Sequence, residues 1–171
     1  MIDPKILIEY GAVKTLYGRD DYIFKKDQSA KFYFQVFSGE VKMNNFSEDG
    51  KEFTQGLFSK GRSFGEPPLL GNFNYPSNAQ AAADSVIFKL GKAKFEQLLT
   101  DKPDVLLKFT KVLAERLYYK AIMAVEISSH ESGHRILALI DYLKNEIYKT
   151  EGQFQFEVKL TRQEIANLTG L

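Results

Sequence analysis

The chain has 171 residues, of which 44% are hydrophobic and 26% charged, and its formal net charge is +1. Such a composition is typical of a globular protein with one good core, or with a core and a small satellite domain, and it excludes a disordered chain. The low net charge argues against a broad polybasic surface but permits a local basic patch on a small domain.

Cysteine is absent from the sequence. Its absence excludes disulfides, a cysteine nucleophile, thiolate zinc sites and cysteine-ligated iron–sulfur clusters, and it agrees with a reducing compartment. No apolar run approaches the ~20 residues that span a bilayer. The first five residues also lack the basic and then apolar layout of a secretory signal. We therefore expect a cytoplasmic protein that makes no membrane contact.

The first ninety residues have the character of short strands. Residues 31–37 are rich in aromatic and β-branched side chains, and a turn at 38–40 leads into a further strand at 41–43. Asp49-Gly50 is a strong hairpin dipeptide, and glycine turns continue to a last strand at 85–90. This spacing predicts a sandwich or a jelly-roll barrel. Four aromatic residues are expected to belong to its core: Phe32, Tyr33, Phe34 and Phe37.

The pattern becomes helical after Gly91. A short amphipathic helix is predicted over 93–99, and a second begins near Pro103, since proline suits an early helical position. Residues 105–127 contain no Gly or Pro and carry a heptad seam with two charged interruptions, formed by Leu106, Phe109, Leu113, Arg116, Lys120, Met123 and Ile127. Other faces of this helix are apolar too. Either it packs on the barrel with one face and on a partner helix with another, or it lies in one larger intramolecular core.

The last forty residues predict a small reader domain. Residues 128–133 indicate a hinge, a second amphipathic helix follows over 134–148, and the alternation of Phe154, Phe156 and Val158 predicts a strand. Thr161 and Glu164 then form a T-x-x-E capping box at the start of a further helix. This order is that of a winged helix-turn-helix. The chain as given stops before a recognition helix, so we do not expect it alone to read bases.

Taken in order, these motifs resemble the Crp/Fnr family of bacterial transcription regulators from about residue 15 onward. The segments that carry the resemblance are Ser38-Gly39-Glu40-Val41, Asp49-Gly50-Lys51-Glu52, Gly61-Arg62-Ser63-Phe64-Gly65-Glu66, the helix from Pro103 to Ile127, Gly133-His134-Arg135-Ile136 and Leu160-Thr161-Arg162-Gln163-Glu164-Ile165. The resemblance implies an α+β fold. Its parts are a β-roll sensor (a double-stranded β-helix or jelly roll, like a cyclic nucleotide-binding domain) with short flanking helices over 1–102, a long dimerisation helix over 103–128, a hinge over 129–133, and a partial winged helix-turn-helix DNA-binding domain over 134–171.

The resemblance also implies an effector site, from which this sequence departs. Gly65 and Glu66 keep the elements that meet a cyclic nucleotide's phosphate and ribose, but Ser77 and Asn78 stand where the family's nucleotide binders carry an arginine clamp. The loss of such a charge-assisted bond costs about 1.5–3 kcal/mol, or roughly tenfold to several hundredfold in affinity. Lys120 lies where the binders place adenine-holding hydroxyls, and it can supply a cation from the helix. These five residues are the candidate effector contacts, and tight binding of cyclic AMP is not expected.

Two readings of the site residues stay open. The alternative for Glu66 is a loop carboxylate bonded to its own backbone, and the alternative for Lys120 is a solvated or interface lysine. The only histidines, His130 and His134, are four residues apart at the hinge. Their spacing permits a shared metal, but solvated hinge residues are the simpler interpretation. Neither lies in the sensor, so no haem, iron–sulfur cluster or other cofactor is expected.

The resemblance implies several partners. Thr161, Arg162 and Gln163 would touch DNA phosphates, residues 105–127 would form a homodimer, and the complete regulator would contact RNA polymerase. No catalytic set is recognisable, so an enzyme is not expected. The alternative function is a cyclic-nucleotide-binding-like sensor module that acts through protein partners without binding DNA.

Overall fold

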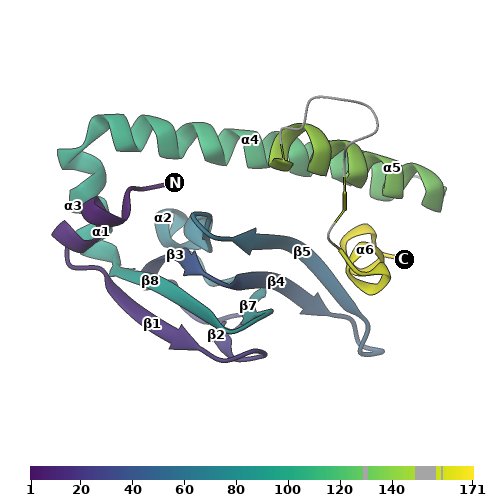
Figure 1. Ribbon diagram of the computed structural model, residues 1–171, viewed down its shortest axis with the longest axis horizontal. Coiled ribbons are helices and arrows are strands. Elements are labelled where there is room, and N and C mark those ends of the chain that lie inside the picture. The colour runs from purple at the N-terminus through teal and green to yellow at the C-terminus, as the bar shows by residue number, and fades with distance from the viewer. Residues whose placement is uncertain (129–130, 149–156, 159) are drawn as a thin grey trace.

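The computed structural model describes residues 1–128, 131–148, 157–158 and 160–171. An antiparallel β-roll lies beneath a long helix, which runs along the longest dimension of the molecule (Figure 1). The strands are β1 (Val13–Tyr17), β2 (Tyr22–Phe24), β3 (Phe32–Ser38), β4 (Glu40–Phe46), β5 (Glu52–Ser59), β6 (Ser63–Phe64), β7 (Asn78–Ala81) and β8 (Ser85–Gly91). The helices are α1 (Pro4–Glu9), α2 (Glu66–Gly71), α3 (Lys92–Asp101), α4 (Pro103–Ser128), α5 (Ser132–Tyr142), a π-helical segment η1 (Leu143–Tyr148) and α6 (Arg162–Thr169).

The strands form two four-stranded antiparallel sheets, in the orders β1-β8-β3-β6 and β2-β7-β4-β5. The predicted hairpin at Asp49-Gly50 is confirmed, because it joins β4 to β5. The Gly50 amide donates to the Ser47 carbonyl at 2.9 Å. Gly50 has a φ of 81°, a left-handed conformation that glycine adopts at low cost because it has no Cβ atom. The predicted strands at 31–37 and 85–90 correspond to β3 and β8.

The alternation of β3 divides the core in two. Phe34 and Val36 point into the roll, where they pack with residues from both sheets, whereas Tyr33 points outward beneath the helices. The Tyr33 ring stacks on Phe95 of α3 at 4.5 Å, and Phe109 of α4 meets Phe95 edge-on at 5.5 Å. Each such buried side chain contributes about 1.5–3 kcal/mol. The aromatic residues of β3 therefore hold the roll together on one side and fix α3 and α4 on the other.

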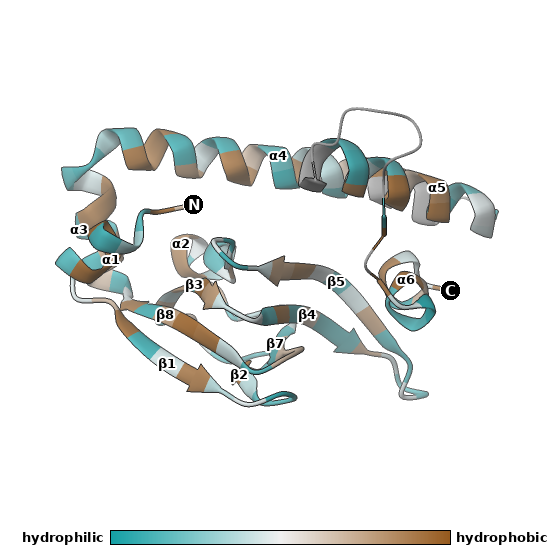
Figure 2. Ribbon diagram, viewed as in Figure 1, coloured by the Kyte–Doolittle hydropathy of each residue, from teal (hydrophilic) through white to brown (hydrophobic). Residues whose placement is uncertain are grey.

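The long helix α4 begins at Pro103, as predicted, and turns the middle of its heptad seam, at Phe109, Leu113 and Arg116, to its own roll. Phe109 is buried and Leu113 packs beside it on the outer core cluster. A different face carries Leu107 and Leu117, which are 72% and 70% exposed. Hydrophobic residues accordingly recur along the whole ribbon of α4, including parts turned away from the roll (Figure 2). One apolar face of this helix thus stays uncovered by the described part of the chain.

The C-terminal elements follow the predicted order only in part. The helix predicted from His134 starts at Ser132 as α5 and changes to π geometry at Leu143. Phe154 and Phe156 of the predicted strand, and Ser129 and His130 of the predicted hinge, lie outside the described residues. Val158 belongs to no regular element. The last helix, α6, contacts both α5 and β5, beside the far end of the roll (Figure 1).

Candidate effector site

The loop between β6 and α2 depends on Gly65. This residue has a φ of 72°, and a Cβ atom added there would lie 2.9 Å from two ring carbons of Phe24. The Phe24 ring is itself stacked on Tyr75 at 3.6 Å, so it has little room to move. A glycine is therefore required both by the backbone conformation and by the aromatic pair that lies against it.

Glu66 follows this glycine and is only 1% exposed. Its carboxylate accepts hydrogen bonds from the Ser63 hydroxyl and from Arg116 Nη1, the latter at 2.9 and 3.2 Å to its two oxygens. Arg116 Nη2 also donates to the Ser63 carbonyl at 2.7 Å. The carboxylate is thus bonded neither to its own backbone nor to Lys120, and an arginine of α4 neutralises its charge.

Arg116 is the site residue that the sequence motifs do not predict. In the sequence it is a charged interruption of the apolar seam on α4, but its side chain crosses from α4 to Ser63 of β6 and to Glu66. The interruption itself was the available signal, because a charge in a buried seam needs a partner. No local pattern distinguishes Glu66 as that partner from the other acidic residues of the chain.

Ser77 and Asn78 lie at the start of β7, and the structure uses them differently. Asn78 bridges neighbouring segments: its Nδ2 donates to the Asn44 carbonyl at 3.3 Å, and its Oδ1 accepts from the Lys26 amide at 3.0 Å. The Ser77 hydroxyl is fully buried and has no hydrogen-bond partner among the described residues. A buried hydroxyl without a partner is costly, so of this pair Ser77 is the residue suited to meet a polar ligand atom.

Two further groups set the electrostatics of the site. Burial, with a contribution from the Glu66 charge, raises the pKa of Tyr75 to about 12, so this phenol remains neutral. Lys120 lies one turn beyond Arg116, and desolvation of its ammonium group, together with the Arg116 charge, lowers the pKa of that group. The arrangement offers a hydroxyl and a neutral phenol, while its charged pair is already satisfied internally.

The segment that enters β7 carries no cation that could pair with a cyclic phosphate. The segment Tyr75-Pro76-Ser77-Asn78-Ala79-Gln80-Ala81 contains no cation, and Arg116 is committed to Glu66 and Ser63. A cyclic nucleotide would have to break this pairing before it could use either charge. The gain from a new charge-assisted bond would be offset by the loss of an existing one.

The three candidate DNA contacts lie together at the start of α6, and the predicted capping box is confirmed. Thr161 Oγ1 accepts from the Glu164 amide at 3.2 Å, and the Glu164 carboxylate accepts from the Thr161 amide at 2.7 Å. Arg162 and Gln163 are exposed, although Gln163 Nε2 donates to Asn167 Oδ1 at 2.8 Å. The helix thus starts with exposed polar side chains beside its own unpaired amides.

The described residues show neither a metal site nor a membrane-spanning helix. They contain no group of three or more acidic or histidine side chains placed to hold a metal ion. His134 Nε2 lies 3.0 Å from Glu131 Oε2, and the predicted alternative of a metal shared with His130 falls outside the described residues. None of the described helices combines the length and the hydrophobicity that a membrane crossing requires.

The fold and the loop at Gly65-Glu66 agree with the comparisons to known proteins. Residues 14–102, just over half of the chain, match the family model of the cyclic nucleotide-binding domain. The chain is a Crp/Fnr-type member of this family. The cAMP-activated global transcriptional regulator CRP of Haemophilus influenzae is 24% identical over 144 residues, which are 84% of this chain and 64% of the Haemophilus protein.

Two other known proteins are similar to this chain, one over nearly its whole length and one over about half of it. The c-di-GMP responsive global regulator CLP of Xanthomonas campestris shares the fold with a TM-score of 0.76 at 21% identity, covering 96% of this chain and 84% of CLP. Lysophospholipase NTE1 of Phaeosphaeria nodorum is 25% identical over 95 residues, which are 56% of this chain but only 6% of that enzyme. The chain thus spans less than two thirds of the Haemophilus relative's length and only a small module of the lysophospholipase.

Proposed function

We propose that this Crp/Fnr-type chain is the sensor and the start of the DNA reader of a ligand-responsive transcription regulator, one that does not bind cyclic AMP tightly. The observation that carries the proposal is α6, a capped helix with Arg162 exposed at its N-terminus, which follows the roll and α4. Exposed donors at a helix N-terminus suit DNA phosphates. The relatives named CRP and CLP, both regulators, support this choice. Such a role implies a cytoplasmic location and contact with RNA polymerase.

We expect the regulator to work by a population shift that starts at Glu66. An effector that bonds to the Glu66 carboxylate must displace Arg116, and this releases the main polar tie between the roll and α4. Residues 105–127 would at the same time hold the dimer, and α4 contacts α5. The rings of Tyr119 and Tyr142 stack across that contact at 3.3 Å. A change at Arg116 can therefore reach the reader domain through α4, across a hinge proposed for residues 129–133.

The DNA role can be tested on this chain, because phosphate contacts need no recognition helix. Fluorescence anisotropy with a random-sequence duplex over a series of salt concentrations should show salt-dependent binding. Arg162→Ala should reduce the slope of log affinity against log salt by about one phosphate contact. Arg19→Ala, an exposed arginine between β1 and β2, is the matched control and should leave the slope unchanged. An unchanged slope in the Arg162 variant would contradict the assignment.

The effector part of the proposal has its own test. Isothermal titration calorimetry with cyclic AMP and cyclic GMP should show affinities weaker by roughly tenfold to several hundredfold than those of a site with an arginine clamp. Micromolar binding of either nucleotide would show that Gly65, Glu66, Ser77, Asn78 and Lys120 form an ordinary cyclic-nucleotide site. If neither nucleotide binds, a thermal-shift screen of other metabolites is the next step towards the effector.

The second candidate is a sensor module that acts through protein partners without DNA binding. Its support is the lysophospholipase match, in which a related roll is a small part of a much larger protein. If no DNA duplex changes the fluorescence anisotropy and a defined protein partner is captured, the sensor module is favoured over the regulator.

A further inference from the structure

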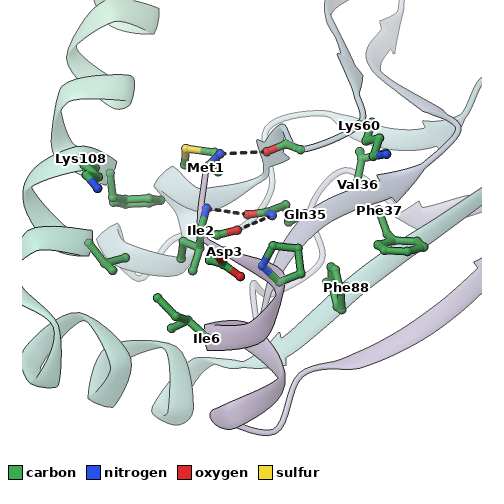
Figure 3. A pocket seen from close by; sticks show the side chains of 14 residues that line it. Met1, Ile2, Asp3, Ile6, Gln35, Val36, Phe37, Lys60, Phe88 and Lys108 are labelled. Carbon is green, nitrogen blue, oxygen red and sulfur yellow. Dashed lines mark hydrogen bonds between the residues drawn. The ribbon is translucent and has the colours of Figure 1, made fainter.

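A cavity of about 450 Å³ lies outside the candidate effector site, between the N-terminal segment, β3 and α4. This volume is within the ~300–1,000 Å³ that is usual for small-molecule pockets. The wall is held by Gln35, whose side-chain amide bonds to both backbone groups of Ile2, at 3.0 Å to the nitrogen and 2.8 Å to the oxygen (Figure 3). Gln35 also accepts from the Tyr33 hydroxyl at 2.7 Å, which fixes its orientation. The cavity is therefore a formed feature of the fold, with an anchored rim.

The lining of this cavity is mainly apolar. Ile6, Val105 and Phe109 come from the two helices, and the rings of Phe37 and Phe88 come from the roll. Phe37 meets Phe88 edge-on at 5.5 Å, so the two rings form one aromatic wall. Such a surface favours an alkyl or aryl body of a ligand, because each buried methylene gains free energy on leaving water.

Two lysines line the rim of this cavity and make it positive, and a third, Lys14, lies outside the lining beside one of its rings. Lys60 and Lys108 lie on opposite sides of it (Figure 3), and both are exposed, without an ion-pair partner among the described residues. The Lys14 ammonium lies 3.5 Å from the centre of the Phe37 ring. Asp3 is the one carboxylate in the lining, and it is engaged at the start of α1, where it accepts from the Lys5 amide at 2.7 Å.

An apolar interior below a cationic rim selects a particular chemistry. We propose that this cavity binds an amphipathic monocarboxylate, with its alkyl or aryl body against Phe37, Phe88 and Phe109 and its carboxylate at the rim that carries Lys60 and Lys108. A cyclic nucleotide is disfavoured here, since a polar sugar would lie against the apolar wall. The site is separate from Glu66, and the proposal does not depend on DNA binding.

The test uses decanoate below its micelle concentration, with isothermal titration calorimetry on the chain. Shortening decanoate to octanoate should weaken binding about fourfold for each methylene removed. Decanol, which has the same body and no charge, should bind more weakly than decanoate. Lys60→Met and Lys108→Met should each weaken decanoate binding about twofold to fivefold, as expected for exposed ion pairs.

The controls separate this site from unspecific adsorption to exposed apolar surface. Lys111→Met, one turn along α4 and outside the cavity lining, should leave the affinity unchanged. In methyl NMR spectra, decanoate should shift Ile6 and Val105 rather than Leu117 on the exposed face of α4. Equal weakening by all three lysine variants, shifts confined to Leu117, or no binding at millimolar decanoate would each overturn the proposal.

Discussion

At the scale of single residues, Gly65 is the most constrained position of the site. Its φ of 72° is unfavourable for other residues by about 1–2 kcal/mol. In addition, a methyl group there would meet the Phe24 ring at 2.9 Å, and Tyr75 blocks the ring's retreat. We therefore expect Gly65→Ala to lower the free energy of unfolding by more than the backbone strain alone, as measured by urea denaturation.

Gly50→Ala provides the matched control for this substitution. Gly50 has a φ of 81°, but a Cβ atom there would have nothing within 4 Å. The Gly50→Ala variant therefore has the backbone strain of a positive φ but no steric clash. Equal losses of stability in the two variants would show that the Phe24 and Tyr75 rings move aside without cost and do not constrain the loop at Gly65.

The Glu66–Arg116 pair allows a second prediction at this scale. Arg116→Leu leaves a carboxylate that is 1% exposed without its cation, and breaking a buried pair in this way costs about 3–5 kcal/mol. The arginine side chain is 20% exposed, so we expect the lower end of that range. The double variant Glu66→Leu/Arg116→Leu should recover much of the loss, because no charge stays buried. Additive losses in a urea-denaturation cycle would refute the coupling.

At the scale of elements, α4 has one apolar face more than its own roll can cover. Leu117 and Tyr118 are 70% and 69% exposed in the middle of the helix, as a partner helix would require. We expect Leu117→Glu/Tyr118→Glu to convert a dimer into a monomer in sedimentation velocity, with the roll still folded. Leu16→Glu, at a position that is 81% exposed on β1, should leave the dimer intact. A wild-type monomer would refute dimerisation through α4.

The orientation of α4 also shows what the sequence could predict. The strands of the roll, the Asp49-Gly50 turn and the capping box at Thr161 follow from local patterns, and these are present. The face that α4 turns to the roll depends on contacts with distant segments, such as the one between Arg116 and Ser63. For the same reason the bridging role of Asn78, which ties β7 to β4, was not predictable from its place in a motif.

At the scale of the whole molecule, the C-terminal helix α6 touches the roll directly. Asn167 Nδ2 of α6 donates to Glu52 Oε2 of β5 at 3.2 Å, and Glu52 is also paired with Lys42 at 2.8 Å. Arg135 of α5 donates to the carbonyls of Thr169 and Gly170, at 3.2 and 3.3 Å, and so holds the end of α6 from the other side. The helix is therefore fixed between the β4–β5 hairpin and α5.

The contact between α6 and the roll places the carboxylates of Glu40 and Glu164 near each other, so the pKa of Glu40 reports on this contact. Desolvation, with a contribution from the Glu164 charge, raises the pKa of Glu40 above its ordinary value of 4.5. When the pKa of a carboxyl is raised in the folded state, its protonated form stabilises the fold. This contribution to stability is fully present below the ordinary pKa of the unfolded state and is lost as pH rises through the raised pKa. We expect acidification from neutral pH towards this window to strengthen the contact between α6 and the roll.

An NMR titration of Glu40 tests the docking without perturbing α6 itself. Glu164→Gln removes the charge but keeps the capping box, since glutamine serves equally at that position. The Glu40 pKa should then fall towards 4.5 without reaching it, because desolvation is the larger cause. Glu48→Gln, in the exposed turn after β4, should leave the pKa unchanged. If Glu164→Gln also leaves it unchanged, α6 does not lie against the roll in solution.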